Sequence, residues 1–434
     1  PGTFYKNIYK LSPASILILE QDGRMTIESY WDLDFSQPPG GPPSEEEAIV
    51  RVRELLFKAV EKRLVSDVPL GVFLSGGVDS SIVVGIMSQI VKDRVRTFSI
   101  GFVGDDSYDE TRYSRLVAEK FHTDHTEFKV RPSAFDLVEK LLWHHDEPYG
   151  DSSAIPTYII SKLTREHVTV ALNGDGGDEL FAGYLKFLAG LLSEKIPPFL
   201  DRLGLGLLNL IYWRDSQHSI LSRAKRFLEA ASLPPVERHV RWSSFFFGQA
   251  LSGLLRQEWA HLIDTEEIAQ SFRECLEKGN GWSPLGKLLY LNTKTYLLDD
   301  LVVKMDRMTM ANSLEARAPF LDTELMEYVA ALPDRMKLRG RRTKYILKKA
   351  FTDVLPEQIQ TRGKMGFGVP LGAWFRTELK GYIHDTLLSP SARIREYLRQ
   401  ERIKEIVDDH EALRRDYGHQ LWSLLQFELW LRKK

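Results

Sequence analysis

The sequence has almost no cysteine and lacks long apolar runs, and each absence excludes a class of protein. Its 434 residues include one cysteine, Cys275, so an internal disulfide or a cysteine zinc site is excluded and a reducing compartment is expected. No run of about eighteen apolar residues is present, and the start lacks the basic-then-apolar pattern of a signal peptide. We therefore expect a cytoplasmic protein that has no membrane-spanning segment.

Net charge is also nearly absent. Lys and Arg number 58 against 60 for Asp and Glu, which gives a formal net charge of −2. No overall field then favours nucleic acid or an acidic membrane surface, so we expect small-molecule substrates and neither of those partners. A hydrophobic content of 43% is enough for a sizeable core, and the length allows two or three domains.

The most informative stretch is residues 70–84. An apolar run leads into Ser75-Gly-Gly-Val-Asp-Ser-Ser81, and a second apolar-periodic run follows, which predicts a buried strand, a tight loop and a helix. Two glycines and three serines at a helix start form a cradle for an anion such as a phosphate. Asp79 within that cradle is explained if a divalent cation bridges its carboxylate and phosphate oxygens. A glycine-rich turn with no ligand is the alternative.

Strands and helices alternate from residue 68 onward, which predicts an α/β fold with a parallel sheet and flanking helices. Because ligands bind beyond the carboxyl ends of such strands, the loops after strands one, two and four are expected to share one crevice. Beyond residue 180 the pattern predicts a mainly helical half. The expected strands are residues 68–74, 96–102, 125–128 and 168–172.

The start of the chain differs from the rest. Two alternating segments, residues 15–19 and 25–29, flank Asp22-Gly23 and predict a β-hairpin, which is too small to be stable alone. It is expected to end a larger β unit or to pack on the body. The predicted division is residues 1–35, a β remnant; 36–44, a Pro- and Gly-rich linker; and 45–434, one domain made of a nucleotide-binding core (45–190) and a mainly helical part (191–434).

A second loop repeats the chemistry of the first. Gly174-Asp-Gly-Gly-Asp-Glu179 follows the strand predicted at 168–172, and its glycines allow close approach while its carboxylates suit a metal ion. We expect Asp79 and Asp178 to hold Mg²⁺ over a triphosphate. A solvated acidic turn is the alternative.

Five motifs in order resemble those of the asparagine synthetase family, most closely the glutamine-hydrolysing B-type branch, whose synthetase domain is an N-type ATP pyrophosphatase with an adenine nucleotide α-hydrolase-like fold. The resemblance covers residues 45–434, and residues 1–35 resemble the end of that family's glutaminase domain. The motifs are Leu74-Ser-Gly-Gly-Val-Asp-Ser-Ser81, Asp146-Glu-Pro-Tyr-Gly-Asp-Ser-Ser153, Asn173-Gly-Asp-Gly-Gly-Asp-Glu-Leu-Phe-Ala-Gly-Tyr184, the segment from Asp306 to Asp322, and Arg362-Gly-Lys-Met-Gly-Phe367.

The resemblance implies a ligase that uses ATP and Mg²⁺ to amidate a carboxylate through an acyl-adenylate, releasing AMP and pyrophosphate. It implies that Lys364 neutralises charge at the α-phosphate, that Lys344 faces the phosphates, and that Asp175 takes a proton from the attacking amine. The residues that it places around the nucleotide are Leu74, Ser75, Gly76, Gly77, Asp79, Ser80, Ile100, Asn173 and Gly174, with Mg²⁺ on Asp79 and Asp178.

Two departures from the family pattern leave the reaction's partners open. Asparagine-forming members usually carry Gly-Glu-Gly-Ser-Asp-Glu, whereas this chain has Asp175 and Gly177 at the two differing positions, so the acceptor is aspartate or a related carboxylate. The N-terminal cysteine nucleophile of the glutaminase domain is not in the sequence, so this chain by itself is expected to use free ammonia, and nitrogen from glutamine would have to be delivered by a part that the sequence lacks. A homodimer is possible.

Several alternatives stay open at this point. They are an intramolecular amide-forming ligase like β-lactam synthetase or a lasso-peptide cyclase, a tRNA-modifying ATP pyrophosphatase, and a non-catalytic partner of an active synthetase. Adjacent His144 and His145 point about 100° apart on a helix and favour a structural role over a metal site. Glu315 and Arg317 suit either an acceptor pocket or a structural ion pair.

Overall fold

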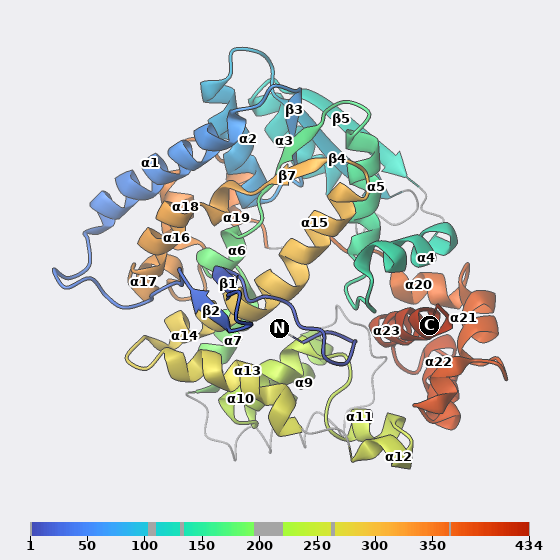
Figure 1. The fold of residues 1–434 in the computed structure, drawn as a ribbon. Coiled ribbons are helices and arrows are strands. Elements are labelled where there is room, and N and C mark those ends of the chain that lie inside the picture. The colour runs from blue at the N-terminus through green and yellow to red at the C-terminus, as the bar shows by residue number, and fades with distance from the viewer. Residues whose placement is uncertain are drawn as a thin grey trace.

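The computed structural model describes residues 2–102, 110–130, 134–194, 220–261, 265–363 and 366–433. Its centre is a five-stranded sheet in the order β5-β4-β3-β6-β7, and every neighbouring pair is parallel. The predicted α/β class is therefore confirmed (Figure 1). The strands are β3 (Leu70–Phe73), β4 (Arg96–Phe102), β5 (Asp124–Val130), β6 (Val170–Leu172) and β7 (Glu315–Arg317).

Strand β7 corrects one prediction, because it lies in the part of the chain expected to be helical. It has only three residues, two of them charged, and so carries no apolar pattern that would have revealed it. It pairs with β6 through Val170 opposite Glu315, and this pairing fixes the late half of the chain to the sheet edge.

Helices cover the sheet and carry most of the core. The twenty-residue α1 starts with a capping box, in which the Ser44 side chain accepts from Glu47 N–H and the Glu47 side chain accepts from Ser44 N–H. In α2 the residues from Val78 to Met87 are buried except Asp79, which is partly exposed at the start of the helix. The helices of this half are α1 (Glu45–Leu64), α2 (Val78–Ile90), α3 (Thr111–Lys120), α4 (Ala134–His145), α5 (Ala154–Thr164), α6 (Gly177–Leu180) and α7 (Leu185–Ser193).

The late half is mainly helical within the described ranges, as predicted. A ten-residue π-helix, η2 (Thr293–Val302), continues directly into α15 (Val303–Met310), which crosses the molecule beside α5 (Figure 1). The other elements are α9 (Ile220–Ala231), α10 (Pro235–Ser243), α11 (Gln249–Leu254), α12 (Gln257–Ala260), α13 (Thr265–Lys278), α14 (Pro284–Asn292), η3 (Pro319–Leu321), α16 (Thr323–Ala330), α17 (Asp334–Lys337), α18 (Tyr345–Ala350), α19 (Glu357–Thr361), α20 (Leu371–Arg376), α21 (Lys380–Leu387), η4 (Arg393–Glu396), α22 (Gln400–Glu411) and α23 (Gly418–Arg432).

The predicted N-terminal hairpin is present as β1 (Ser15–Leu19) and β2 (Met25–Ser29), paired antiparallel. Its apolar side chains are largely exposed, whereas Leu33 and Phe35 just after it are buried in the body. Asp32 accepts a hydrogen bond from Tyr290 Oη at 2.7 Å, so this segment anchors the hairpin to the helical half. No helix in the described ranges is long and apolar enough to cross a membrane.

Candidate functional site

The first predicted loop lies at the carboxyl end of the central strand β3. Gly76 has φ +68°, and a Cβ there would come within 2.5 Å of the Tyr113 side chain, so the position requires glycine. Helix α2 follows from Val78 with Gly77 as its N-cap and no side-chain cap, which leaves backbone N–H groups directed at the loop. Ser75 and Ser80 add hydroxyls whose oxygens lie 3.1 Å apart. This arrangement suits phosphate oxygens.

The second predicted loop lies at the end of β6, the neighbour of β3, and packs against the first. A Cβ on Gly174 would lie 2.9 Å from Asp79 Cβ, and one on Gly177 would lie 2.5 Å from the Asp79 carboxyl carbon. The absence of side chains at these two glycines is therefore what lets the loops meet. Asn173 Nδ2 donates to Asp175 Oδ2 at 3.0 Å and holds that carboxylate within the loop.

Lys344 lies between the two carboxylates that were expected to bind metal. Its Nζ is 2.5 Å from Asp79 Oδ2 and 2.6 Å from Asp178 Oδ1, and its side chain is almost fully buried. Burial alone would lower the pKa of Lys344, but Asp178 and Asp79 outweigh it and raise that pKa above its usual value. A Cβ on Gly183 would collide with both Asp178 and Lys344, so a further glycine makes room for this cluster.

The donor set suits Mg²⁺ better than a closed metal site. No group of three or more His, Cys, Asp or Glu side chains arranged to hold a metal occurs among the described residues. Two carboxylates around one cation fit Mg²⁺, which binds proteins through one or two carboxylates and completes its shell with waters and substrate phosphates. Asp79 and Asp178 are thus chemically suited to the role predicted for them.

The remaining predicted nucleotide contacts are Leu74, directly after β3, and Ile100 in β4. They are 1% and 7% exposed, so their backbone groups offer more to a ligand than their side chains do. Lys364 lies outside the described residues. Arg362, which the sequence interpretation did not single out, reaches the first loop: its guanidinium donates to Gly76 O at 3.0 Å. Its place two residues before Lys364 in a recognised motif was the signal that could have identified it.

A second buried lysine cluster was not predicted. Lys304 on α15 donates to Asp151 Oδ2 at 2.7 Å and to Ser153 Oγ at 2.6 Å. Burial lowers the pKa of Lys304, but Asp151 and Asp300 outweigh it and the net pKa is raised; Asp175 of the second loop acts in the same direction. The cluster therefore lies within electrostatic reach of the predicted site.

Asp300, on the π-helix η2, completes this cluster. Tyr149 Oη donates to the Asp300 carboxylate and to its carbonyl oxygen, the latter at 2.8 Å. Burial, and then the Asp151 carboxylate, raise the pKa of Asp300 to about 6. On the other side, the His145 ring stacks on Tyr149 at a centroid distance of 3.9 Å, and burial lowers the pKa of His145 to about 3. Short π-helical segments are frequent at functional sites.

The sequence left the roles of two residue pairs open, His144 with His145 and Glu315 with Arg317, and the structure shows the contacts of both. His145 packs on Tyr149 as described, which agrees with the structural interpretation of the histidine pair. Arg317 pairs with Glu315 at 2.6 Å and donates to the Arg63 and Val65 carbonyls, each at 2.8 Å, so it caps the end of α1. These contacts favour the structural alternative for Glu315 and Arg317.

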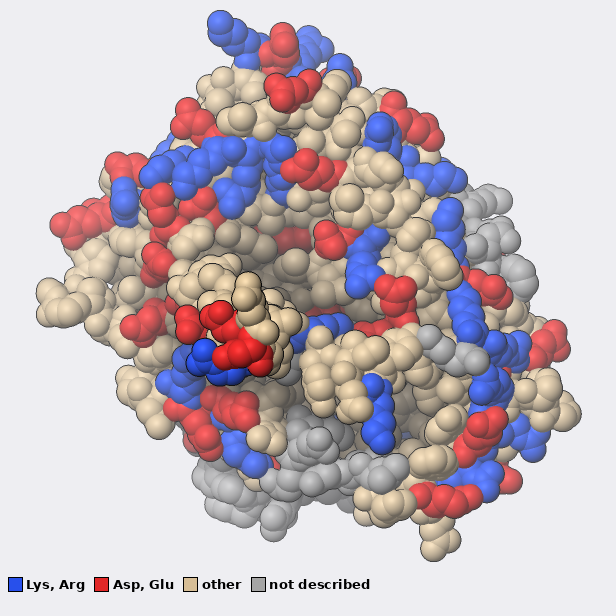
Figure 2. Space-filling view, in the orientation of Figure 1, with Lys and Arg blue, Asp and Glu red and all other residues tan. Residues whose placement is uncertain are grey.

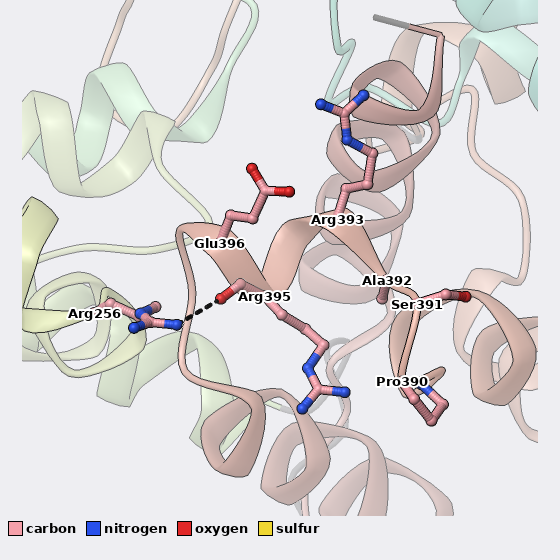
Figure 3. A pocket seen from close by; sticks show the side chains of 7 residues that line it. All are labelled: Arg256, Pro390, Ser391, Ala392, Arg393, Arg395 and Glu396. Carbon is pink, nitrogen blue, oxygen red and sulfur yellow. Dashed lines mark hydrogen bonds between the residues drawn. The ribbon is translucent and has the colours of Figure 1, made fainter.

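The surface is hollowed beside the β1–β2 hairpin and over α15, and both acidic and basic side chains line this hollow (Figure 2). A separate pocket of about 340 Å³ lies near η4, where Arg256, Arg393 and Arg395 are the basic lining residues. Figure 3 shows the Arg393 and Arg395 side chains pointing in opposite directions, while Arg256 donates to the Arg395 carbonyl at 3.2 Å. These cations do not converge, so the hollow over α15 is the better candidate site.

Comparisons with known proteins show which family the chain resembles. A family profile described as asparagine synthase matches residues 51–432. The chain is 30% identical over 432 residues to an asparagine synthetase (glutamine-hydrolysing) of Bacillus subtilis, a match that covers 99% of this chain and 66% of that protein. A putative asparagine synthetase of Methanocaldococcus jannaschii is 35% identical over 71% of this chain and 58% of its own length. A Penicillium rubens protein called amidase is 27% identical over 86% of this chain and 60% of its own.

Proposed function

The chain belongs to the asparagine synthase family, and on that premise we propose that it catalyses the ATP-dependent amidation of a carboxylate through an acyl-adenylate, with release of AMP and pyrophosphate. One observation carries the proposal: two glycine-rich loops at the carboxyl ends of β3 and β6 bring Asp79 and Asp178 to opposite sides of the Lys344 ammonium. A phosphate cradle combined with paired carboxylates suits a magnesium-bound triphosphate better than a bare anion.

Each residue then has a defined task. Ser75, Gly76, Gly77 and Ser80 bind the pyrophosphate part of ATP through hydroxyls and backbone N–H groups. Mg²⁺ on Asp79 and Asp178 supplies charge neutralisation for the phosphates. Lys344 and Lys364 offer positive charge where the transition state of adenylation accumulates negative charge. Leu74, Ile100, Asn173 and Gly174 border the nucleoside.

The acceptor and the nitrogen source belong to the same proposal. Asp175, whose carboxylate accepts a hydrogen bond from Asn173, takes a proton from the attacking amine in this proposal. The acceptor is aspartate or a related carboxylate, and the nitrogen comes from glutamine or ammonia. Because the chain spans 66% and 65% of the lengths of the first two relatives, these are proposals for the chain and not transfers of their names.

The test is release of AMP and pyrophosphate from ATP with Mg²⁺ and ammonium, measured without acceptor, with aspartate, and with a mixed pool of carboxylates. We expect release that depends on an acceptor, and we expect Asp178→Asn to lower it by about 10³-fold, because a carboxylate beside the phosphates is lost. Asp93→Asn, an exposed change just after α2, is the matched control.

Release of ADP and phosphate would contradict adenylation, and full activity of Asp178→Asn would contradict the metal assignment. Lys364→Ala is expected to slow adenylation with any acceptor that works, so undiminished adenylation would contradict its role. Asparagine formed with aspartate would identify the acceptor, whereas release with the pool alone would identify another carboxylate.

A further inference from the structure

Arg362 joins the end of helix α19 to the first glycine-rich loop. Its side chain is only 10% exposed, and one guanidinium nitrogen, Nη1, donates to the Gly76 carbonyl oxygen at 3.0 Å. The other, Nη2, pairs with the carboxylate of Glu110, which directly precedes α3, and the centre of the Tyr113 ring lies 4.0 Å from Arg362 Cζ. The guanidinium is therefore held at two nitrogens and on one face, which fixes its position.

The parts of the chain on both sides of this contact are also fixed. A Cβ on Gly76 would come within 2.6 Å of Ser114 N, so the loop backbone lies directly on the first turn of α3. Helices α2 and α3 lie side by side (Figure 1). Lys348 on α18 donates to the Gln360 carbonyl at 3.0 Å and anchors the end of α19. Arg362 thus reaches the loop from a helix end that cannot easily move away.

The contact sets which way the peptide group between Gly76 and Gly77 faces. The C=O and N–H of a trans peptide point in opposite directions, and no cis peptide bond occurs among the described residues. Because the Gly76 oxygen points at Arg362, the Gly77 N–H points the other way, where it donates to Ser75 Oγ at 3.3 Å. Ser80 Oγ lies 3.1 Å from Ser75 Oγ, so one N–H and two hydroxyls converge on one place.

The opposite orientation of this peptide group would not bind an anion. Reversal rotates ψ of Gly76 and φ of Gly77, and glycine restricts these angles less than any other residue does. A reversed peptide would direct its carbonyl oxygen, which carries partial negative charge, at the phosphates and would remove one donor. A guanidinium on the Gly76 carbonyl therefore favours the orientation that receives a phosphate, before any ligand arrives.

We propose that Arg362 is a positioning residue for the pyrophosphate part of ATP: it holds the Gly76–Gly77 peptide so that the Gly77 N–H faces the phosphates. The proposal rests on the proposed function and names the residue that prepares its phosphate loop. Glu110 supports this role, because its carboxylate holds the guanidinium in place beside Gly76. A lysine at position 362 would not do the same, since a single ammonium lacks the planar fork that serves both partners.

The experiment compares ligands that contain the two terminal phosphates with one that lacks them. Dissociation constants are measured by calorimetry for magnesium pyrophosphate, for a magnesium complex of ATP with a methylene bridge between the α- and β-phosphorus, and for AMP. We expect Arg362→Met to bind the first two about 10- to 100-fold more weakly, the scale of one hydrogen bond to a charged group, and AMP within about twofold of normal. Arg341→Met, which removes the same charge from an exposed position before α18, is the control and should leave all three constants unchanged.

Two further variants separate this role from a loss of stability. Arg362→Met removes a partner of the partly buried Glu110 carboxylate, which costs stability, whereas Arg362→Met combined with Glu110→Gln leaves no such charge and should show the same selective loss. Arg362→Lys keeps the charge and should recover only part of the affinity for pyrophosphate. Without ligand, amide hydrogen exchange in residues 75–82 should be faster in Arg362→Met than in the unaltered protein, because the loop is no longer held.

Each other outcome has a separate meaning. Unchanged binding of magnesium pyrophosphate by Arg362→Met would overturn the inference, and so would an equal weakening of AMP binding. Weaker pyrophosphate binding with unchanged hydrogen exchange in residues 75–82 would mean that the guanidinium binds phosphate directly, which also overturns a positioning role. If the unaltered protein binds neither magnesium pyrophosphate nor the ATP analogue, the proposed function itself fails; if it binds both and Arg362→Met binds them equally well, only the inference fails.

Discussion

The molecule contains two buried lysines that each face two aspartates, and the two clusters differ in how the charges are shared. Lys344 binds both of its carboxylates, Asp79 and Asp178, at 2.5 and 2.6 Å. Lys304 binds Asp151 and the Ser153 hydroxyl, while Asp300 is held by Tyr149. The first cluster is a symmetric charge arrangement, whereas the second divides its carboxylates into one that is ionised and one that has a raised pKa.

The surroundings of the clusters explain this difference. Gly177 and Gly183 leave room for Asp79, Asp178 and Lys344 to pack tightly, and the Asp79 and Asp178 side chains are only 14% and 7% exposed. In the Lys304 cluster the Asp151 side chain is 24% exposed, and Tyr149 donates to Asp300. Two carboxylates on one ammonium suit exchange of the lysine contact for a metal and phosphates, whereas a carboxylate that is partly buried beside another carboxylate has a raised pKa.

The largest expected effect comes from breaking the symmetric cluster. Lys344→Met removes the ammonium between two buried carboxylates, and loss of one partner from a buried ion pair costs about 3–5 kcal/mol. Thermal unfolding without ligand should therefore occur at a clearly lower temperature. Mg²⁺ should raise the unfolding temperature of Lys344→Met more than that of the unaltered protein, because the metal then replaces the missing charge.

The control for this change is Lys349→Met, which removes an exposed lysine from α18, the helix that begins directly after Lys344. It should alter stability by a few tenths of a kcal/mol, with an ordinary response to Mg²⁺. If Mg²⁺ stabilises all three proteins equally, Asp79 and Asp178 are not its ligands.

The next largest expected effect tests the raised pKa of Asp300 through the pH dependence of stability. In Asp300 the folded-state pKa of about 6 is above the usual aspartate value of 3.8, so the folded protein binds more protons than the unfolded chain between these values. The contribution of Asp300 to stability therefore falls as pH rises through this window and stays low above it. Relative to the unaltered protein, Asp300→Asn should gain up to about 3 kcal/mol between roughly pH 4 and pH 7 in urea denaturation.

Asp299→Asn provides a graded comparison: burial raises the pKa of Asp299 as well, but this residue is more exposed than Asp300, so its gain with pH should be smaller. A relative stability of Asp300→Asn that does not rise with pH would show that the pKa of Asp300 is not raised in the folded protein.

The two clusters also differ in how well the sequence predicts them. The loops around Asp79 and Asp178 were predicted because each is a continuous string of glycines and carboxylates after an apolar strand, and the strands could be identified from their alternation with helices. Lys344 was named only through a family resemblance, because nothing local shows that its side chain crosses to both loops.

The Lys304 cluster had a signal on one side only: Tyr149, Asp151 and Ser153 belong to a motif that resembles the family's, but nothing in the sequence indicated Lys304 or Asp300 as their partners. Asp151 and Lys304 are 153 positions apart and meet only because α5 packs on α15. Lys304 follows the apolar Val302 and Val303, where a lysine suggests a solvated helix face, and the π-helix that carries Asp300 has no recognised sequence pattern. Strand β7 was not predicted for a related reason: it is a strand because it pairs with β6, and its composition does not indicate one.

The smallest expected effect concerns His145, whose ring stacks on Tyr149. His145 has a folded-state pKa of about 3 against the usual histidine value of 6.5, mainly because burial disfavours the imidazolium ion. Stability is therefore lost as pH falls below the unfolded value, because the unfolded chain binds the proton that the folded protein excludes. In His145→Phe the stacked ring remains and this titration is gone, so the variant should gain about 2 kcal/mol over the unaltered protein between roughly pH 7.5 and pH 5. His144→Phe, whose ring is more exposed, should gain less, and an equal gain in both variants would mean that burial against Tyr149 does not set the pKa of His145.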